Sequence, residues 1–337
     1  MKALSRKHSI LTVVIVASIT MAFFFSIHAF PQAKAEEPKK TVGILISSDF
    51  RLPKIVGLKD TMKKYGYIEG ETITYSLKNA DRDREQLPIL AQELVDEQPD
   101  VIFVAGEAEA LAAQKAAEET QIPIIFVGVD SAKKLGLVES NASPEKNITG
   151  VENYYLLLSG KRLEYFQRLL PDVKRIAVIF DPRVTPTQST LVFLDDVAQN
   201  LNLTLQSFPV CSLEDVLNAL DGIDRQDFDG VMFLCCDLLE SITDEVSPIA
   251  IEKQIPIMGV SEEQTQNGLL ASYGMPYYEQ GEQAARMIAK VLNGENPSLI
   301  PVEPPEKVEF IVNLETAEKL GLTLDSAGLT CVTKFIR

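Results

Sequence analysis

The stretches VIFVA, residues 101–105, and IIFV, residues 124–127, are continuous apolar runs rich in β-branched side chains. Runs of this length are typical of strands buried on both faces, as in a parallel sheet. Similar runs precede them at residues 42–46 and 73–77. Between these runs, apolar residues recur three and four positions apart, as in residues 87–95, which indicates helices. The first half therefore predicts alternating strands and helices around a parallel sheet.

The second half repeats this alternation. Its apolar runs lie at residues 176–180, 203–208, 231–234, 256–260 and 269–273, again with helical segments between them. Strand starts about 25–30 residues apart match the length of a βαβ unit. The chain has 337 residues, enough for two domains that each bury a core. We therefore predict an α/β protein with two doubly wound lobes.

Turn signals in the sequence predict where the chain crosses between the two lobes. The stretch NITG, residues 147–150, has the turn chemistry expected where the chain leaves the first lobe. A helix predicted for residues 278–292 is followed by Asn293 and Gly294, and a strand at 308–312 then suggests another crossing. Several crossings make a hinge. We expect lobe 1 to comprise 41–150 plus 277–305, lobe 2 to comprise 151–276 plus 306–326, and 327–337 to form a C-terminal tail.

Residues 1–35 have the layout of an export signal. Basic residues at the start precede an apolar run at 10–27 and the small-x-small cleavage site AKA at 33–35. Eighteen mostly apolar residues are also enough to span a bilayer, so an uncleaved anchor stays open as an alternative. We expect cleavage of this signal peptide and a periplasmic or otherwise extracytoplasmic mature protein.

Composition excludes several classes of function. Both histidines, His8 and His28, lie within the predicted signal, so the mature part has no imidazole for acid–base catalysis or metal binding. The glycine-rich phosphate-binding motifs and the nucleophile elbow are also missing. The net charge is −16, and removal of the signal leaves 28 basic against 48 acidic residues, which argues against nucleic acid. We expect a binding protein without a metal or cofactor, not an enzyme; an enzyme that uses carboxylates alone is a remaining alternative.

The chain has four cysteines, too few for a disulfide scaffold. Neighbouring residues on a strand point to opposite faces, so Cys235 and Cys236 should not bridge each other. Two interpretations remain: the cysteines are buried and reduced, or one bridge links Cys211 to Cys235 or Cys236. Cys331 completes the set.

Five segments in the same order resemble one known family. They are YGYIEGE (65–71), QIPIIF (121–126), NITGV (147–151), YYEQG (277–281) and VNLETAEKLG (312–321). Together they resemble the ABC-transporter substrate-binding proteins of the tryptophan/tyrosine-binding type, from about residue 41 to residue 322. The resemblance implies a bilobed fold like type I periplasmic-binding proteins, in which two lobes joined by a multi-strand hinge close on a small solute. It implies delivery of that solute, in several members an aromatic amino acid, to a membrane permease with its ATPase, and we expect a monomer.

The resemblance also places the ligand at the loops that follow the strands, where α/β lobes bind ligands. Asp237 matches the acidic position of the family that would pair with a ligand ammonium, although it could also cap a helix beginning near Leu238. Charged residues in GEAE (106–109) and DPRV (181–184) depart from the family pattern, so an aromatic ligand is only the family default. The candidate ligand-binding residues are Ser47, Ser48, Asp49, Gly106, Glu107, Asp130 and Ser131 in lobe 1, and Asp181, Arg183, Thr185, Thr187, Asp237 and Ser261 in lobe 2.

Each candidate has a structural alternative. Residues 47–49 could bind the ligand or cap a helix near Pro53, and Glu107 and Asp130 could be solvent-facing caps. The hydroxyls at 185–189 could bind an anion at a helix start or only cap that helix, and Arg183 could clamp an acid group or lie on the surface. Tyrosines at 154–155 and 277–278 could stack on a ligand or pack the hinge. The rival function in another class is a sensory module that presents its closed state to a membrane receptor.

Overall fold

The first lobe is built on a parallel sheet. The computed structural model describes residues 38–184 and 187–337, so the predicted signal at 1–35 lies outside the described residues. The sheet has the strand order β2-β1-β3-β4-β5, and every pairing in it is parallel. Its strands are β1 (Lys40–Ile46), β2 (Ile73–Asn79), β3 (Val101–Val104), β4 (Ile124–Val129) and β5 (Ile148–Glu152).

Helices cover both faces of this sheet, and apolar clusters fill the space beneath them. Full burial of one Leu, Ile or Phe side chain contributes about 1.5–3 kcal/mol, so these two clusters hold the lobe together. The helical elements are η1 (Asp49–Arg51), α2 (Leu52–Lys64), η2 (Arg84–Gln86), α3 (Leu87–Asp96), α4 (Glu107–Ala116), α11 (Tyr277–Leu292) and η3 (Pro297–Leu299).

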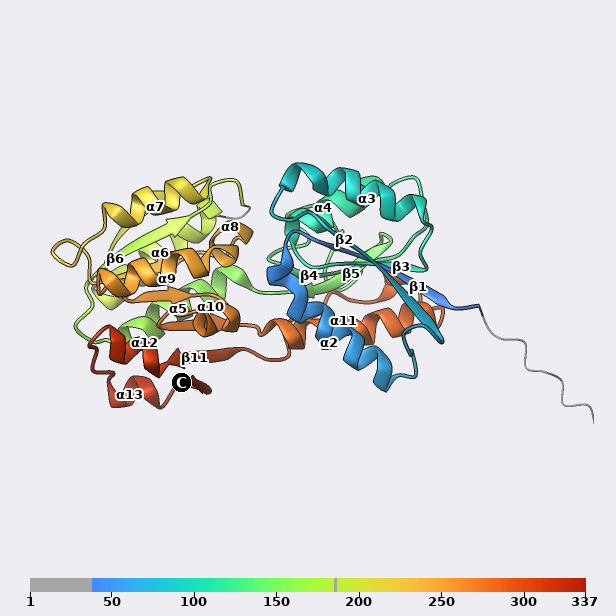
Figure 1. Ribbon diagram of the computed structural model, residues 1–337. Coiled ribbons are helices and arrows are strands. Elements are labelled where there is room, and N and C mark those ends of the chain that lie inside the picture. Colours follow the sequence, from blue (N-terminus) through green and yellow to red (C-terminus); the bar gives the residue numbers. More distant parts are fainter. Residues whose placement is uncertain (1–37, 185–186) are drawn as a thin grey trace, which may run out of the picture. The chain divides into compact units, whose positions relative to one another are not determined.

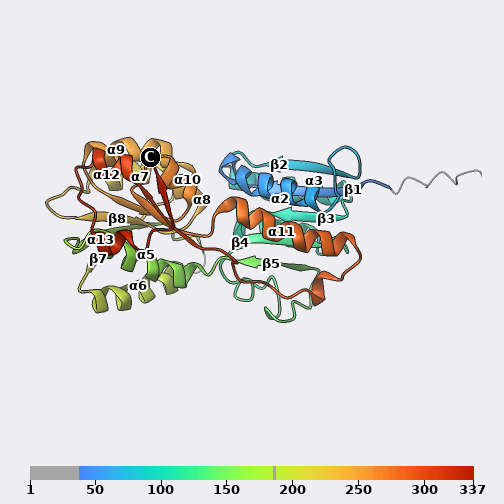
Figure 2. The same ribbon diagram turned by 90° about the horizontal axis from the view of Figure 1, so that it is seen from below.

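Helix α11 reaches this lobe from a distant part of the chain and lies against α2 (Figures 1 and 2). Their backbones approach closely because both carry a glycine at the contact. A Cβ atom at Gly57 would lie 2.0 Å from the carbonyl oxygen of Tyr278, and one at Gly281 would lie 1.9 Å from that of Lys54. This contact brings the start of α11 next to the residues that follow β1.

The second lobe has a larger, mixed sheet. Within the described residues its strand order is β12-β11-β10-β9-β8-β6-β7, and only the β10–β11 pairing is antiparallel. Its strands are β6 (Arg175–Phe180), β7 (Thr204–Pro209), β8 (Gly230–Phe233), β9 (Ile257–Gly259), β10 (Ala271–Gly274), β11 (Glu309–Asn313) and β12 (Lys334–Ile336). Its helices are α5 (Tyr155–Leu169), α6 (Thr187–Leu201), α7 (Leu213–Asp221), α8 (Asp237–Ser241), α9 (Thr243–Glu252), α10 (Glu262–Gln266), α12 (Leu314–Lys319) and α13 (Ser326–Leu329).

The α/β class with two parallel-dominated sheets is confirmed, but the turn expected at 147–150 is wrong. Residues Ile148–Glu152 form the edge strand β5, which pairs with β4. Its β-branched side chains favour an extended backbone over a turn. The segment 327–337, expected as a tail, contains β12, which pairs in parallel with β11. The chain leaves the first lobe after β5, returns to it between β10 and α11, and leaves it again before β11.

The four cysteines are free, and no disulfide joins them. The expectation of buried cysteines is correct for Cys236, whereas Cys211 is exposed and Cys235 and Cys331 are partly exposed. The alternative bridge from Cys211 is therefore wrong. Within the described part of the chain, none of the helices has the length and apolar character needed to cross a bilayer.

Candidate functional site

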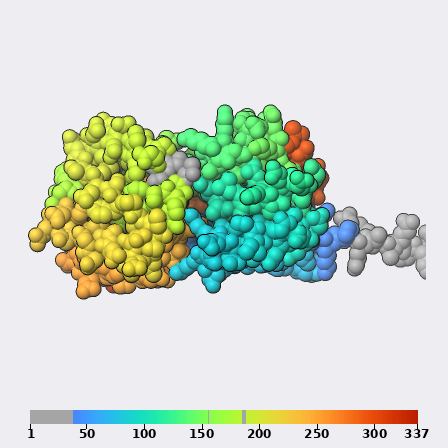
Figure 3. All heavy atoms as spheres, turned by 90° about the horizontal axis from the view of Figure 1, so that it is seen from above, coloured from blue at the N-terminus to red at the C-terminus, as the bar shows by residue number. Residues whose placement is uncertain are grey.

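A pocket of about 240 Å³ opens at the carboxyl ends of strands from both sheets, which is where α/β lobes bind ligands. In the space-filling view the two lobes meet along a boundary with a hollow in it (Figure 3). A larger hollow of about 550 Å³ lies near the starts of β4 and β5, but only first-lobe residues line it. The pocket between the lobes is lined by Arg51, Arg84, Glu107, Ala108, Leu111, Gly128, Asp130, Asn153, Arg183, Val184, Cys235, Cys236 and Asp237.

Four of the residues proposed from the sequence line this pocket: Glu107, Asp130, Arg183 and Asp237. Glu107 begins α4, and Asp130 follows β4 and accepts a hydrogen bond from the backbone N–H of Leu156 at 3.2 Å. Each therefore stands in a loop or helix start just beyond a strand. The structure brings these four side chains together from loops that are up to 130 residues apart in the sequence.

The other candidates among the described residues do not line it. The Ser47 N–H donates to Glu109 at 3.0 Å, and Asp49 accepts from Asn79 at 2.7 Å. Ser261 caps α10. Gly106, Ser131, Ser48 and Asp181 are also absent from the lining, and Thr185 and the side chain of Thr187 lie outside the described residues.

Two of the predicted capping roles are wrong. Helix α8 begins at Asp237 itself, and its N-cap is Cys236, whose Sγ accepts from the Leu239 N–H at 3.5 Å. The helix near Pro53 begins at Leu52, and its N-cap is Arg51, which makes no side-chain capping bond. At Asp237 the helix begins one residue earlier than the pattern suggested, so the capping position falls on Cys236. Before α2 the 3-10 turn η1 intervenes, and Ser48 is the N-cap of that turn but makes no side-chain capping bond.

Asp237 instead forms ion pairs with two arginines of the first lobe. Arg51 contacts one carboxylate oxygen, and Arg84 lies 3.4 Å from the other. Burial alone would raise the pKa of Asp237, but the charges of Arg51 and then Arg84 outweigh it and lower the pKa. The Asp237 carboxylate is therefore held in its charged form.

Arg51 is the centre of this cluster. It follows β1 in η1, its side chain is 8% exposed, and it also donates to Glu240 and to the Tyr277 hydroxyl, each at 2.8 Å. The Tyr277 hydroxyl in turn contacts Glu240. Burial would lower the pKa of Arg51, but Asp237 and Glu240 raise it well above its usual value. One buried guanidinium thus connects residues of both lobes.

Two further buried charges lie nearby. Lys54, one turn into α2, donates to the Ala105 carbonyl at 2.6 Å, and its ammonium lies 4.4 Å from the centre of the Tyr277 ring. Burial, followed by the charge of Arg51, lowers the pKa of Lys54 to about 7. Glu109 is fully buried, and burial, assisted by Asp237, raises its pKa. The site therefore holds several charges away from water, which is common at functional sites.

The sequence reasoning missed Arg51, Arg84, Lys54 and Glu240. Arg84 lies in the loop after the second strand, which was not considered, and Arg51 directly follows the proposed 47–49 segment. Both could have been found by extending the loop rule to every strand of the lobe. Lys54 and Glu240 lie within helices, where a charged residue is usually expected in solvent, so no signal marked them.

Residues 39–335 match a family model described as ABC transporter substrate binding protein. The chain belongs to this family. It is 28% identical over 304 residues to the tyrosine-binding protein of Clostridioides difficile (strain R20291), covering 89% of this chain and 87% of that one. It is also similar to the structure of a conserved domain protein from Vibrio cholerae, with 26% identity, a TM-score of 0.81, and coverage of 89% and 100%.

A structure from Streptococcus pneumonia described as an ABC domain in complex with L-Trp has a TM-score of 0.80 at 20% identity, covering 88% of this chain and all of that one, and shows the same fold. The resemblance found in the sequence is thus confirmed. As an ABC transporter substrate-binding protein, the chain is an extracytoplasmic solute-binding protein that takes a small molecule and works with a permease.

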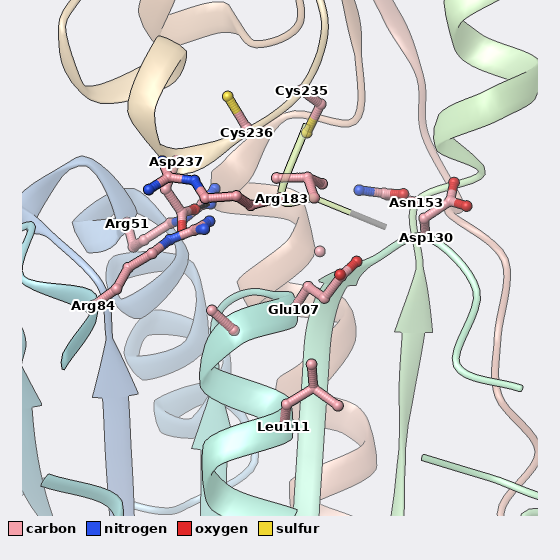
Figure 4. A pocket seen from close by; sticks show the side chains of 13 residues that line it. Arg51, Arg84, Glu107, Leu111, Asp130, Asn153, Arg183, Cys235, Cys236 and Asp237 are labelled. Atoms are coloured by element: carbon pink, nitrogen blue, oxygen red, sulfur yellow. Dashed lines mark hydrogen bonds and ion pairs between the residues drawn. The ribbon is translucent and has the colours of Figure 1, made fainter. Parts of the chain in front are cut away.

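For a substrate-binding protein, the pocket has a notable distribution of charge. Arg51, Arg84 and Asp237 lie together on one side, and Asp130 lies on the opposite side with Glu107 between them (Figure 4). Among the described residues no cluster suited to a metal ion is present. A pocket with cations at one side and carboxylates at the other can hold the two charged groups of a zwitterion.

Proposed function

We propose that the protein captures an amino acid, with L-tyrosine as the first candidate, in the pocket between its lobes and delivers it to an ABC permease and its ATPase. The observation that supports this proposal is the separation of charge across the pocket, with arginines on one side, Asp130 on the other and Glu107 between them. Tyrosine comes first because a relative that shares 28% of its residues over most of the chain is a tyrosine-binding protein.

The charges suggest an orientation for the amino acid. Its carboxylate would face Arg51, because arginine recognises carboxylates through paired N–H donors. Its ammonium would face Glu107 and Asp130. The family resemblance suggests that Asp237 pairs with the ammonium, but that carboxylate already accepts from two arginines. In this orientation Asp237 positions the arginines and does not bind the solute directly.

Binding would act by a shift between open and closed arrangements of the lobes. A solute that touches both lobes stabilises the closed arrangement by the contacts that only this arrangement makes. The permease would then recognise the closed protein. We propose further that the signal at 1–35 is cleaved, so that a monomeric mature protein beginning near Glu36 works outside the cytoplasm.

The test uses the purified mature chain, residues 36–337, with calorimetry and thermal unfolding against single amino acids, sugars and organic acids. We expect saturable binding of L-tyrosine and a rise in melting temperature, since a ligand at 100 times its Kd adds about 2.7 kcal/mol of stability. Glu107→Gln and Asp130→Asn should each weaken that binding, whereas Glu118→Gln, on the same lobe but outside the pocket, should not. A chain that binds a sugar or a dicarboxylate and no amino acid would refute the proposal.

A further inference from the structure

A second, smaller cavity of about 40 Å³ adjoins the pocket. The two share Arg51, Gly128, Asn153 and Cys235 in their linings, so they are neighbouring parts of one space. The smaller cavity lies where the chain crosses between the lobes, at the start of α11. A water molecule needs about 10–15 Å³ of such volume, so this cavity has room for a group of roughly three heavy atoms but not for an aromatic ring.

Lys54 supplies a cation to this cavity that no acid neutralises directly. Its side chain is fully buried, and among the described residues no carboxylate oxygen lies within 4 Å of its Nζ. Of the three ammonium protons, one is donated to the Ala105 carbonyl oxygen. A buried ammonium without an anion is costly, which gives an anionic guest a strong reason to enter.

Gln280 adds an unpartnered group to the same cavity. Its side chain is 4% exposed, its amide nitrogen donates to the Met275 carbonyl at 3.0 Å, and its Oε1 has no hydrogen-bond partner. This oxygen and Lys54 Nζ both lie within 4 Å of the position that a Cβ atom on Gly128 would take, so the two groups face the same space. A buried acceptor without a donor is unusual in a native protein and calls for an explanation. A carboxylate cannot donate to this oxygen, whereas a proton of the Lys54 ammonium can.

Gly128 keeps the cavity open. It has a φ of +73°, in the left-handed region, at an irregularity in β4. A Cβ atom there would lie 2.9 Å from Lys54 Nζ and 3.6 Å from Gln280 Oε1. Any larger residue would therefore be strained by its backbone and would fill the space between these two groups.

The acid that lines the cavity is already satisfied within the protein. Glu240 accepts from Arg51 and contacts Tyr277 through one oxygen, and it accepts from Cys235 Sγ through the other at 3.0 Å. Its charge is therefore directed at Arg51. The excess charge facing the cavity is positive, which favours an anionic guest over a cationic one.

We propose that this hinge-side cavity receives the carboxylate of the bound amino acid, with Lys54 as its direct cation and Gln280 as the residue that holds the remaining Lys54 proton in place. The proposal rests on the proposed function, because it takes the solute to be an amino acid. It adds a buried recognition element beyond the arginines: the carboxylate enters the small cavity and the rest of the molecule stays in the larger pocket. A solute without a carboxylate would leave Lys54 unpaired.

The test compares L-tyrosine with L-tyrosinamide, which keeps the ammonium and the ring but lacks the carboxylate. Affinities are measured by calorimetry at pH 6 for the wild type, for Lys54→Met, and for the matched control Lys59→Met on the exposed side of the same helix. We expect Lys54→Met to lower the affinity for L-tyrosine at least tenfold and to change that for L-tyrosinamide by less than twofold. Lys59→Met should change neither.

The outcomes separate this proposal from the proposed function. If the wild type binds L-tyrosine and Lys54→Met weakens both ligands equally, or weakens neither, the carboxylate does not meet Lys54 and this proposal is wrong while the proposed function stands. If the wild type binds no amino acid, the proposed function fails, and this proposal fails with it.

Proton uptake gives a second measurement that does not depend on the variant folding. The pKa of Lys54 is about 7, and a bound carboxylate would raise it, so wild-type binding of L-tyrosine should take up a proton at pH 7.5 and weaken between pH 6 and pH 8.5. Calorimetry in two buffers of different ionisation heat measures this uptake. Uptake should persist in Glu263→Gln, and its absence in the wild type would overturn the proposal. The charged and titratable groups that interact with Lys54 or line its cavity are Arg51, Glu109, Arg162, Cys235, Asp237, Glu240, Glu263 and Tyr277.

Discussion

Two arginine–aspartate pairs stand at the same pocket and differ in what they join. Arg51 and Asp237 come from different lobes, and their side chains are 8% and 16% exposed. Arg183 and Asp181 lie two residues apart in one loop, and their side chains are 50% and 0% exposed. The first pair is a contact between lobes whose two side chains are both largely buried, whereas the second is local and its arginine is half exposed. An arginine–aspartate pair therefore joins the two lobes in one place and connects residues of a single loop in the other.

The partners of each pair follow from this difference. Arg51 serves Asp237, Glu240 and Tyr277 at once, so its guanidinium is surrounded by groups of the other lobe and of the crossing at α11. Arg183 donates to Asp181 at 2.9 and 2.6 Å and to the Cys211 carbonyl at 2.9 Å, which keeps its contacts within the second lobe. Loss of Arg51 should therefore affect the whole molecule, and loss of Arg183 should affect one loop.

Among the substitutions that test this comparison, Arg51→Ala should lower the free energy of unfolding the most. The substitution removes the arginine that Glu240 contacts and leaves Asp237 with Arg84 alone, and breaking a buried pair from one side costs about 3–5 kcal/mol. We expect the free energy of unfolding, measured by urea denaturation, to fall by this amount. Arg84→Ala removes the more exposed of the two partners of Asp237 and should cost less than about 1 kcal/mol. A loss below about 1 kcal/mol for Arg51→Ala would show that the pair contributes little.

Glu263 extends the comparison to a largely buried carboxylate that has no arginine partner among the described residues. Its Oε2 has no hydrogen-bond partner, and burial raises its pKa to about 7. The folded state then binds more protons than the unfolded state between about pH 4.5 and pH 7, so this group's stabilisation is present at low pH and is lost as the pH rises through 7. We expect Glu263→Gln to raise the free energy of unfolding by about 2 kcal/mol at pH 8 and to leave it nearly unchanged at pH 5.

The check is a pair of denaturation curves at the two pH values, with Glu252→Gln on the exposed end of α9 as the control. The control should show no difference between the two pH values. If Glu263→Gln gave the same gain at pH 5 as at pH 8, the effect would come from packing and not from the buried charge.

The sheets were predictable because their signal is local. Runs such as 101–105 and 231–234 are apolar without interruption, which only a strand buried on both faces requires, and both form central strands. The exception is Ile148–Glu152, whose polar and glycine residues matched turn chemistry although the strand is buried at a sheet edge. There the pairing with β4 decides the structure, and that pairing is not visible in the segment itself.

The candidate site was predictable only in part, because its geometry depends on contacts between segments far apart in the sequence. Loop position after a strand pointed to Glu107, Asp130 and Asp237, which line the pocket. The partners of Asp237 could not be read in this way, since Arg51 lies 186 residues earlier in the chain. Lys54 is buried where α11 packs against α2. The spacing of residues within α2 does not show that another helix packs there.

The smallest expected effect belongs to the local pair. Burial alone would raise the pKa of Asp181, but hydrogen bonds from Arg183 outweigh it and lower the pKa, so the stability this pair contributes is present at neutral pH and is lost as the pH falls through the acidic range. Because Arg183 is half exposed, solvent screens the pair, and Arg183→Ala should cost on the order of 1 kcal/mol at pH 7 and less at pH 3. Urea denaturation at both values measures this. A cost equal to that of Arg51→Ala would mean that the position of a pair, within a loop or between lobes, does not set its contribution.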